Sequence, residues 1–238
     1  MMRPFSWTQL YISLVAGVRF IPQTLILAIV PFVLALILGM IIAMVRMWNV
    51  PVLSQIFQAY VVIVKGIPMY LLLIIGSLLY MSYFDVVAEH FGWTIRQSNV
   101  SMIWLGIVLL EIPASQAVSE VFRGAFLSVP KEQYEAGYVA GLSRWQVARD
   151  VVIPQMLSEA MPGLTNTFVA LVKGSALCSL IGVTEVMSSS VRAATASYDF
   201  VEAYIATVII YWPLCMSIEF VMGRIERRIS GFRTVLVA

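Results

Sequence analysis

The chain has 238 residues, of which 61% are hydrophobic and 12% charged, and its formal net charge is +2. Soluble domains carry about 25% charged residues, so this composition argues against a water-soluble fold and favours a protein that lies in a lipid bilayer. The near-neutral charge, without a long basic run, argues against nucleic acid as a partner. One histidine and two cysteines give no disulfide framework and no metal-ligand spacing, so we expect neither a metal site nor a catalytic site.

The first long apolar run, Phe20–Val45, contains no charged residue. About 20 apolar residues are enough to cross a bilayer as a helix. The residues before it, MMRPFSWTQLYISL, carry little positive charge and precede no clear small-residue cleavage site. We therefore expect a retained membrane span here rather than a cleaved signal peptide.

Four further apolar runs predict an all-α membrane protein with about five transmembrane helices. They cover approximately Ile67–Phe84, Val100–Leu127, Ala160–Val186 and Tyr204–Met222. The polar stretch Asp85–Asn99 is expected to be an exposed loop between the second and third spans. Lys173 and Gly174 interrupt the fourth span.

An odd number of spans places the two termini on opposite sides of the membrane. With an external N-terminus, the inner segments contain most of the Arg and Lys residues, including the cluster Arg224, Arg227 and Arg228. Basic residues concentrate on the cytoplasmic side of membrane proteins. We therefore predict an external N-terminus, a cytoplasmic C-terminus and a cytoplasmic location for the polar segment Pro130–Gln155.

This cytoplasmic segment carries the signals of two short helices joined at a glycine. Pro130 suits the first turn of one helix, and Gly141 can end that helix in a left-handed conformation. Ser143 and Gln146 have the S-x-x-Q spacing of a capping box, which would start the second helix. Pro154 is expected to end or kink the second helix. So much local order in a loop indicates a docking element.

The stretch E-A-G-x3-G-x9-V-x-I-P, from Glu135 to Pro154, resembles the EAA loop of permease subunits of ABC-type importers. Three flanking blocks are similar to the polar amino-acid branch of that family: KGIPMYLLL at residues 65–73, RGAFLSVPKEQYEAG at 123–137 and PGLTNTFVALVKGSALCSLIGVTE at 162–185. The resemblance implies the transmembrane domain of a type I ABC importer over residues 1–238. It also implies that residues 130–155 dock in a groove of the ATP-hydrolysing subunit. The coupling residues that it implies are Glu135, Ala136, Gly137, Gly141, Leu142, Ser143 and Pro154.

The chain departs from the family pattern at a few positions. Gly137 replaces the second alanine of the EAA motif, which weakens a helix by about 1 kcal/mol. Lys65 stands where arginine is usual. Gly174-Ser175-Ala176 replaces Asp-Thr-Ser, and Ala117 stands where an aromatic residue is common. The last two departures lie in or near the expected pathway and bear on the identity of the substrate.

Polar residues inside the fourth span are candidates for the substrate pathway. Asn166 and Lys173 are two helical turns apart and share one face. Gly174 would allow the helix to break, as discontinuous helices do at transporter sites, and Ser175 follows it. Lys173 is a candidate partner for the substrate carboxylate. Snorkelling and an interhelical salt bridge to an acid such as Glu111 or Glu185 are the alternatives.

Two acids lie on the third span. Glu111 is the deeper one, and it either lines the pathway or is held by buried hydrogen bonds. Glu120 is close to the cytoplasmic end and can pair with Arg123 one turn away.

These features favour a transport subunit without catalysis of its own. The chain contains no G-x-x-x-x-G-K-[ST] motif, so ATP would be bound and hydrolysed by partner subunits and the chain itself needs no cofactor. The resemblance implies two ATPase subunits, a second permease subunit, an extracytoplasmic solute-binding protein and an amino-acid substrate. It also implies a place in the bacterial cytoplasmic membrane. PVLS at residues 51–54 favours a cystine-type substrate.

The alternatives are a self-sufficient secondary carrier and an intramembrane enzyme. The absence of an inverted repeat and the ordered cytoplasmic helix pair argue against the carrier. The absence of a nucleophile–base cluster argues against the enzyme.

Overall fold

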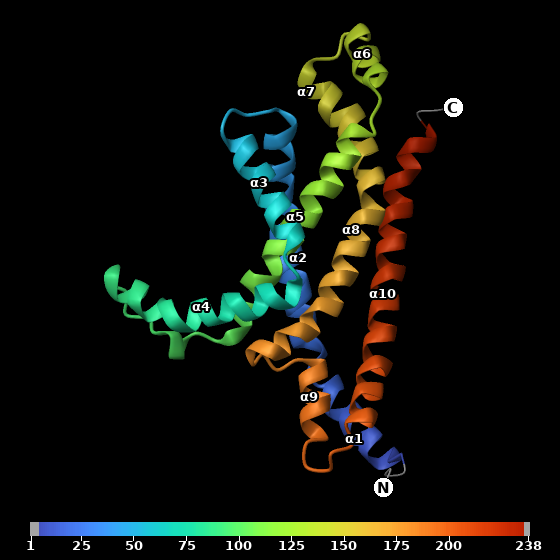
Figure 1. Cartoon of the computed structure of the whole chain (residues 1–238). Helices are drawn as coiled ribbons and strands as arrows, with labels where there is room; N and C mark the ends of the chain where they lie inside the picture. The colour runs from blue at the N-terminus through green and yellow to red at the C-terminus, as the bar shows by residue number, and fades with distance from the viewer. Residues whose placement is uncertain (1–4, 236–238) are drawn as a thin grey trace.

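The computed structural model of the chain describes residues 5–235, and these residues form helices joined by short turns without any strand. Five of these helices are long and apolar enough to cross a membrane. They are α2 (Ile21–Met47), α4 (Met69–His90), α5 (Met102–Leu127), the helix Arg144–Ile181 that contains α8, and α10 (Phe200–Val235). This confirms the predicted all-α fold with five spans. Figure 1 shows α1 and the far end of α10 at opposite ends of the molecule.

The core of the molecule lies where α2 and α5 cross. A methyl group on Gly39 of α2 would lie 2.7 Å from Val118 Cγ1 of α5, so the glycine allows the two helices to approach closely. Leu27 of α2 and Leu110 of α5 are fully buried in the same hydrophobic core. Pro31 lies inside α2 without ending it, as membrane helices allow.

The second span is preceded by a separate helix, α3 (Leu53–Gly66), which runs back beside α2 (Figure 1). The turn between them contains Val52 at φ 67° and ψ −55°, and the Leu53 N–H donates to Pro51 O at 2.8 Å. This is a γ-turn of the positive-φ form, which is strained for a β-branched residue.

After the break at Pro68, α4 extends sideways from the other spans (Figure 1). Most of its apolar surface is exposed within this chain. The predicted loop Asp85–Asn99 begins too early, because residues 85–90 continue the helix.

Two short helices, α1 (Trp7–Val18) and α9 (Val186–Ala193), lie together at the end opposite α6. Polar side chains join them: Ser190 Oγ donates to Ser13 O at 3.0 Å, and Gln9 Nε2 donates to Ala193 O at 3.0 Å. The charge and hydropathy pattern did not predict either helix. Each is too short to cross a bilayer.

The fourth span corrects the expectation for Pro154. It is one continuous helix made of α7 (Arg144–Gln146), the π-helical segment η2 (Val147–Val152), α8 (Ile153–Ser175) and the 3₁₀ segment η3 (Ala176–Ile181). Pro154 therefore does not end a separate short helix; it lies in the first turn of α8, after the π turns. The chain stays helical past Gly174, and the α-helix changes to the 3₁₀ segment one residue later, after Ser175. A methyl group on Gly174 would lie 2.8 Å from Met69 Cε, so the glycine serves close packing, and the helix ends at Gly182 with φ 83°.

Candidate functional site

The segment implied to couple to an ATPase begins with α6 (Lys131–Val139). Its end has the hydrogen bonds of a Schellman motif: the Gly141 N–H donates to Tyr138 O and the Leu142 N–H donates to Gly137 O, both at 3.0 Å. Gly141 has φ 82°, a left-handed conformation that glycine adopts without steric cost. The predicted glycine stop is thus confirmed.

The predicted capping box is also confirmed. The Gln146 N–H donates to Ser143 Oγ at 3.3 Å, and the Ser143 N–H donates to Gln146 Oε1 at 2.8 Å. The helix that starts here is the fourth span itself. The loop therefore consists of one short helix, one turn and the first turns of a transmembrane helix.

Gly137 has a structural reason to be a glycine. It is the buried residue of α6, and a methyl group on it would lie 2.7 Å from Val147 Cγ2 in the π segment. Val147 is itself buried and, being β-branched, is stiff at χ1. The departure from the EAA pattern therefore lets α6 pack directly on the base of the fourth span.

Two further contacts anchor the loop to the rest of the chain. Tyr134 and Leu142 are half-buried and pack against the hydrophobic core. Burial raises the pKa of Tyr134, and the nearby Tyr138 adds to this effect, so its hydroxyl remains neutral at physiological pH.

The rest of the loop is exposed, including Glu135 and Ala136. Three large apolar or aromatic side chains are exposed around the Gly141 turn: Tyr138 at 47%, Val139 at 90% and Trp145 at 69%. We call Tyr138, Val139 and Trp145 the loop patch. These residues were not predicted from the sequence, although apolar side chains inside a polar, capped segment are a signal for a contact surface.

A cavity of about 320 Å³ lies where the start of α4 meets the middle of α5 and α8. Its lining is mainly apolar, with Asn166 and Thr167 as the polar side chains. Pro113 and Ala117 of α5 line it, and Met69 closes it from α4. The structure thus brings Asn166 together at one cavity with Ala117, which departs from the family's sequence pattern.

Lys173 lies on the same exposed face of α8 as Asn166, outside the lining of this cavity. Among residues 5–235 its ammonium group makes no ion pair. Glu185, one candidate partner, instead accepts hydrogen bonds from the Ser188 and Met187 N–H groups and from Tyr211 Oη, at 2.7 to 2.8 Å. The permanent salt bridge considered for Lys173 is therefore absent from the described part of the chain.

Gly174 and Ser175 lie close to the cavity but do not line it. Gly174 packs against Met69. Ser175 is fully buried; its Oγ donates to Val172 O at 2.7 Å and lies 3.3 Å from Tyr211 Oη of α10. This serine contributes to helix packing rather than to the cavity wall.

Glu111 is not part of the cavity either. It is half-buried on α5, and its Oε1 has no hydrogen-bond partner among the described residues. One turn further along, Ser115 Oγ and Tyr60 Oη of α3 lie 2.7 Å apart. Glu111 therefore does not share the cavity with Asn166.

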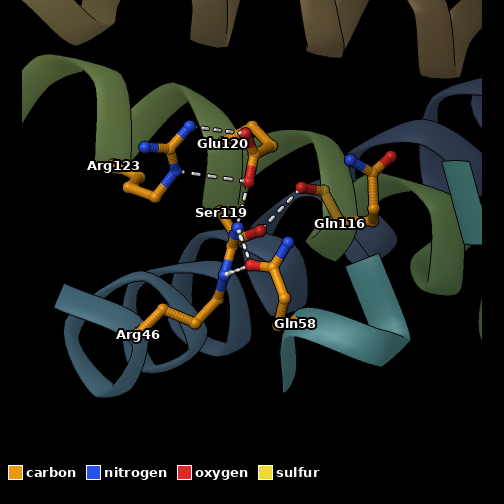
Figure 2. A network of polar contacts seen from close by, with 6 residues as sticks. All are labelled: Arg46, Gln58, Gln116, Ser119, Glu120 and Arg123. Carbon is orange, nitrogen blue, oxygen red and sulfur yellow. Dashed lines mark hydrogen bonds and ion pairs between the residues drawn. The ribbon is translucent and has the colours of Figure 1, made fainter. Parts of the chain in front are cut away.

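An ion-pair cluster at the α6 end joins three helices (Figure 2). Arg123 Nη2 lies 3.0 Å from Glu120 Oε2, which confirms the predicted pair. Arg46 of α2 binds the other oxygen of Glu120, and its Nη2 donates to Gln58 Oε1 of α3 at 2.7 Å. Sequence spacing indicated the local pair but could not reveal Arg46, because the contact joins residues distant in the chain.

Comparison with known proteins places this chain in a family. The family model described as "Binding-protein-dependent transport system inner membrane component" matches residues 7–231. The L-cystine transport system permease protein TcyB of Bacillus subtilis (strain 168) is 30% identical over 88% of this chain and 84% of its own length. The histidine/lysine/arginine/ornithine transport system permease protein HisQ of Escherichia coli (strain K12) is 30% identical over 87% of this chain and 90% of its own length.

Solved structures support the fold. One described as "Crystal structure of an amino acid ABC transporter with histidines" has a TM-score of 0.76 at 24% identity, covering 96% of this chain and 100% of that chain. An inward-facing structure of the MetNI methionine ABC transporter has a TM-score of 0.63 at 20% identity, covering 94% and 99% of the two chains. With five apolar helices and a match over nearly its whole length, the chain belongs to the family of binding-protein-dependent transport system inner membrane components and is a multi-pass protein of the inner membrane.

Proposed function

We propose that this chain is the permease subunit of an ABC importer for a neutral polar amino acid. In this assembly two ATPase subunits, a second permease subunit and a solute-binding protein complete the transporter. The observation that carries the proposal is the loop of α6 and α7, which is ordered by its own caps yet leaves Glu135 and the loop patch exposed. A polar loop with exposed aromatic and aliphatic side chains is suited to dock in a groove of a partner.

The continuous fourth helix supplies a mechanical route from the docked loop to the pathway. A movement of the partner pushes α6 and the Gly141 turn, and α6 rests on Val147 at the base of this helix. The same helix carries Asn166 at the cavity and Lys173 beyond it. A displacement at the loop therefore reaches the pathway without passing through a flexible linker.

The cavity supports the choice of substrate class. Its volume of about 320 Å³ lies at the small end of the about 300–1,000 Å³ range of ligand pockets. Its lining contains no charged side chain, so it suits a substrate whose side chain is neutral. Lys173, on the same helix face and without an ion pair in the described chain, is our candidate partner for the carboxylate of the amino acid.

Reconstitution in liposomes tests the proposal. The chain is co-purified with its partner ATPase and solute-binding protein, and uptake of radiolabelled cystine and of other neutral amino acids is measured with and without ATP. We expect uptake only with ATP. Glu135→Lys should abolish uptake while ATP hydrolysis continues, and Glu132→Lys, an exposed charge reversal on the same helix, should retain most of it.

Two results would contradict this proposal. Uptake without the ATPase would identify a secondary carrier. Equal uptake by the Glu135→Lys and unmodified proteins would remove the docking role from α6.

A further inference from the structure

A second, larger cavity of about 790 Å³ lies beside the ion-pair cluster, at the end of the molecule that carries α6. It is bounded by the end of α2, by α3 and by the end of α5, and it shares no lining residue with the 320 Å³ cavity. Arg46 and Arg123 line it. We propose that this cavity binds the anionic headgroup of a membrane phospholipid, with part of an acyl chain along α3.

The charge in the cavity wall is unbalanced. Arg46 and Arg123 bring two positive charges, and Glu120 is the acid that pairs with both of them. The cluster therefore keeps a net charge of +1, which a singly charged phosphodiester would neutralise. A charge inside or beside a low-dielectric bilayer is costly without such a partner.

The two arginines are arranged to bind an anion rather than merely to be near one. The side chain of Arg46 is only 7% exposed, and Glu120 and Gln58 hold it in place (Figure 2). Arg123 is 36% exposed and uses Nε and Nη2 for Glu120. Its Nη1 makes no hydrogen bond within the described residues, so this fixed guanidinium retains donors for a phosphate oxygen.

The α3 side of the cavity changes from polar to apolar along the helix. Ser54, Gln55 and Gln58 line the part nearest the α2–α3 turn, and Ala59 and Val62 line the part further along. Val62 is 60% exposed, so the cavity continues into an open apolar surface. A free phosphate ion would use the polar part alone, whereas a phospholipid would use both parts.

The proposal is tested by measuring the binding of short-chain lipids to the full-length chain. The chain is purified in neutral detergent together with its partner subunits. Dioctanoyl phosphatidylglycerol is titrated while the melting temperature is recorded, and bound lipid is counted by native mass spectrometry. Dioctanoyl phosphatidylcholine tests the need for net negative charge, and inorganic phosphate tests the need for an acyl chain. We expect saturable stabilisation by phosphatidylglycerol, and little from the other two.

Two substitutions locate the site without breaking the ion pairs. Gln55 is exposed and forms no hydrogen bond with the cluster in the described part of the chain, so Gln55→Glu adds a negative charge to the wall while Gln55→Leu is its uncharged control. We expect Gln55→Glu to weaken phosphatidylglycerol binding about tenfold, because the added carboxylate cancels the net positive charge of the wall and repels the phosphodiester. Val62→Trp should weaken lipid binding by filling the apolar part, and Arg96→Gln, far from the cavity, should have no effect.

Three outcomes would overturn the proposal. Equal binding of phosphatidylcholine would show that net charge plays no part. Equal stabilisation by phosphate, unaffected by Val62→Trp, would identify a site for a small anion instead of a lipid. Unchanged phosphatidylglycerol binding by Gln55→Glu would place the lipid elsewhere on the chain.

Discussion

The contact between Gly137 and Val147 gives the loop a packing requirement. Gly137→Ala would improve the intrinsic helix propensity of α6 by about 1 kcal/mol. However, it would also place a methyl group 2.7 Å from Val147 Cγ2, and overpacking of this kind costs about 1–3 kcal/mol. We expect a lower melting temperature and weaker ATP-driven uptake, measured on the purified protein and in liposomes.

Two controls separate this steric effect from helix propensity. Val147→Ala in the Gly137→Ala background should restore both properties, since it removes the colliding methyl group. Gly124→Ala lies in a helix with no atom near its added methyl group, so it should leave stability equal or slightly higher. A stable, fully active Gly137→Ala protein would show that α6 moves freely relative to the fourth span.

Replacing Lys173 is expected to lower uptake without lowering stability. Because it makes no ion pair in the described chain, Lys173→Met should leave the melting temperature nearly unchanged. Uptake should fall at least tenfold through weaker engagement of the substrate carboxylate, and Lys173→Arg should retain part of it because the charge remains. Normal uptake by Lys173→Met would reduce the residue to a snorkelling side chain.

Side-chain roles in this chain were predictable only where they depended on local spacing. Two pairs have partners three positions apart in the sequence, Ser143 with Gln146 and Glu120 with Arg123. The sequence alone therefore indicated each pair. The packing role of Gly174 was not predicted, because its close neighbour is Met69, a residue distant in the chain. A helix break and a close helix contact both favour glycine, and only the tertiary structure distinguishes them.

At the scale of elements, the turn between α2 and α3 stores backbone strain at Val52. A β-branched residue at φ 67° costs about 1–3 kcal/mol. Val52→Gly should relieve this strain and raise the melting temperature. The rise is reduced in part because glycine increases the conformational entropy of the unfolded chain. Val50→Gly, in the same turn without a positive φ, should lower it. Equal effects of the two substitutions would argue against strain at Val52.

Hydropathy predicted the long helices well and the short ones poorly. Apolar runs of span length identified α2, α4, α5, the fourth span and α10, because crossing the bilayer sets a minimum length. Helices α1, α3 and α9 have no such length signal. The π turns before Pro154 were not predicted either, since the choice between ending a helix and widening it depends on packing such as that of Val147.

At the scale of the whole molecule, the direction of insertion is open to a direct test. Cys178 and Cys215 are first replaced by alanine, and single cysteines are then introduced at Ser98 and Ser230. The excess of basic residues around α6 and the end of α10 predicts that these parts are cytoplasmic. An impermeant thiol reagent should therefore label Ser98→Cys in intact cells and Ser230→Cys only after lysis. The opposite pattern would mean that the chain is inserted the other way.

The arrangement of the whole chain was the part least accessible from sequence. The count of spans followed from composition, but the sideways course of α4 did not (Figure 1). Its exposed side chains, such as Leu78 and Leu79, are apolar whether they face lipid or another subunit. Hydropathy reports that a side chain prefers an apolar environment, and lipid and a protein surface satisfy that preference equally.

The π segment Val147–Val152 sets the rotational phase of the fourth span. A π turn accommodates about one residue more than an α turn, and one residue corresponds to about 100° of rotation in an α-helix. Deleting a single residue from this segment would therefore turn Ser143 and Trp145 by about that angle relative to Asn166. Relatives that differ by one residue here would align well on both sides of the gap and still present a different face of this span to the pathway.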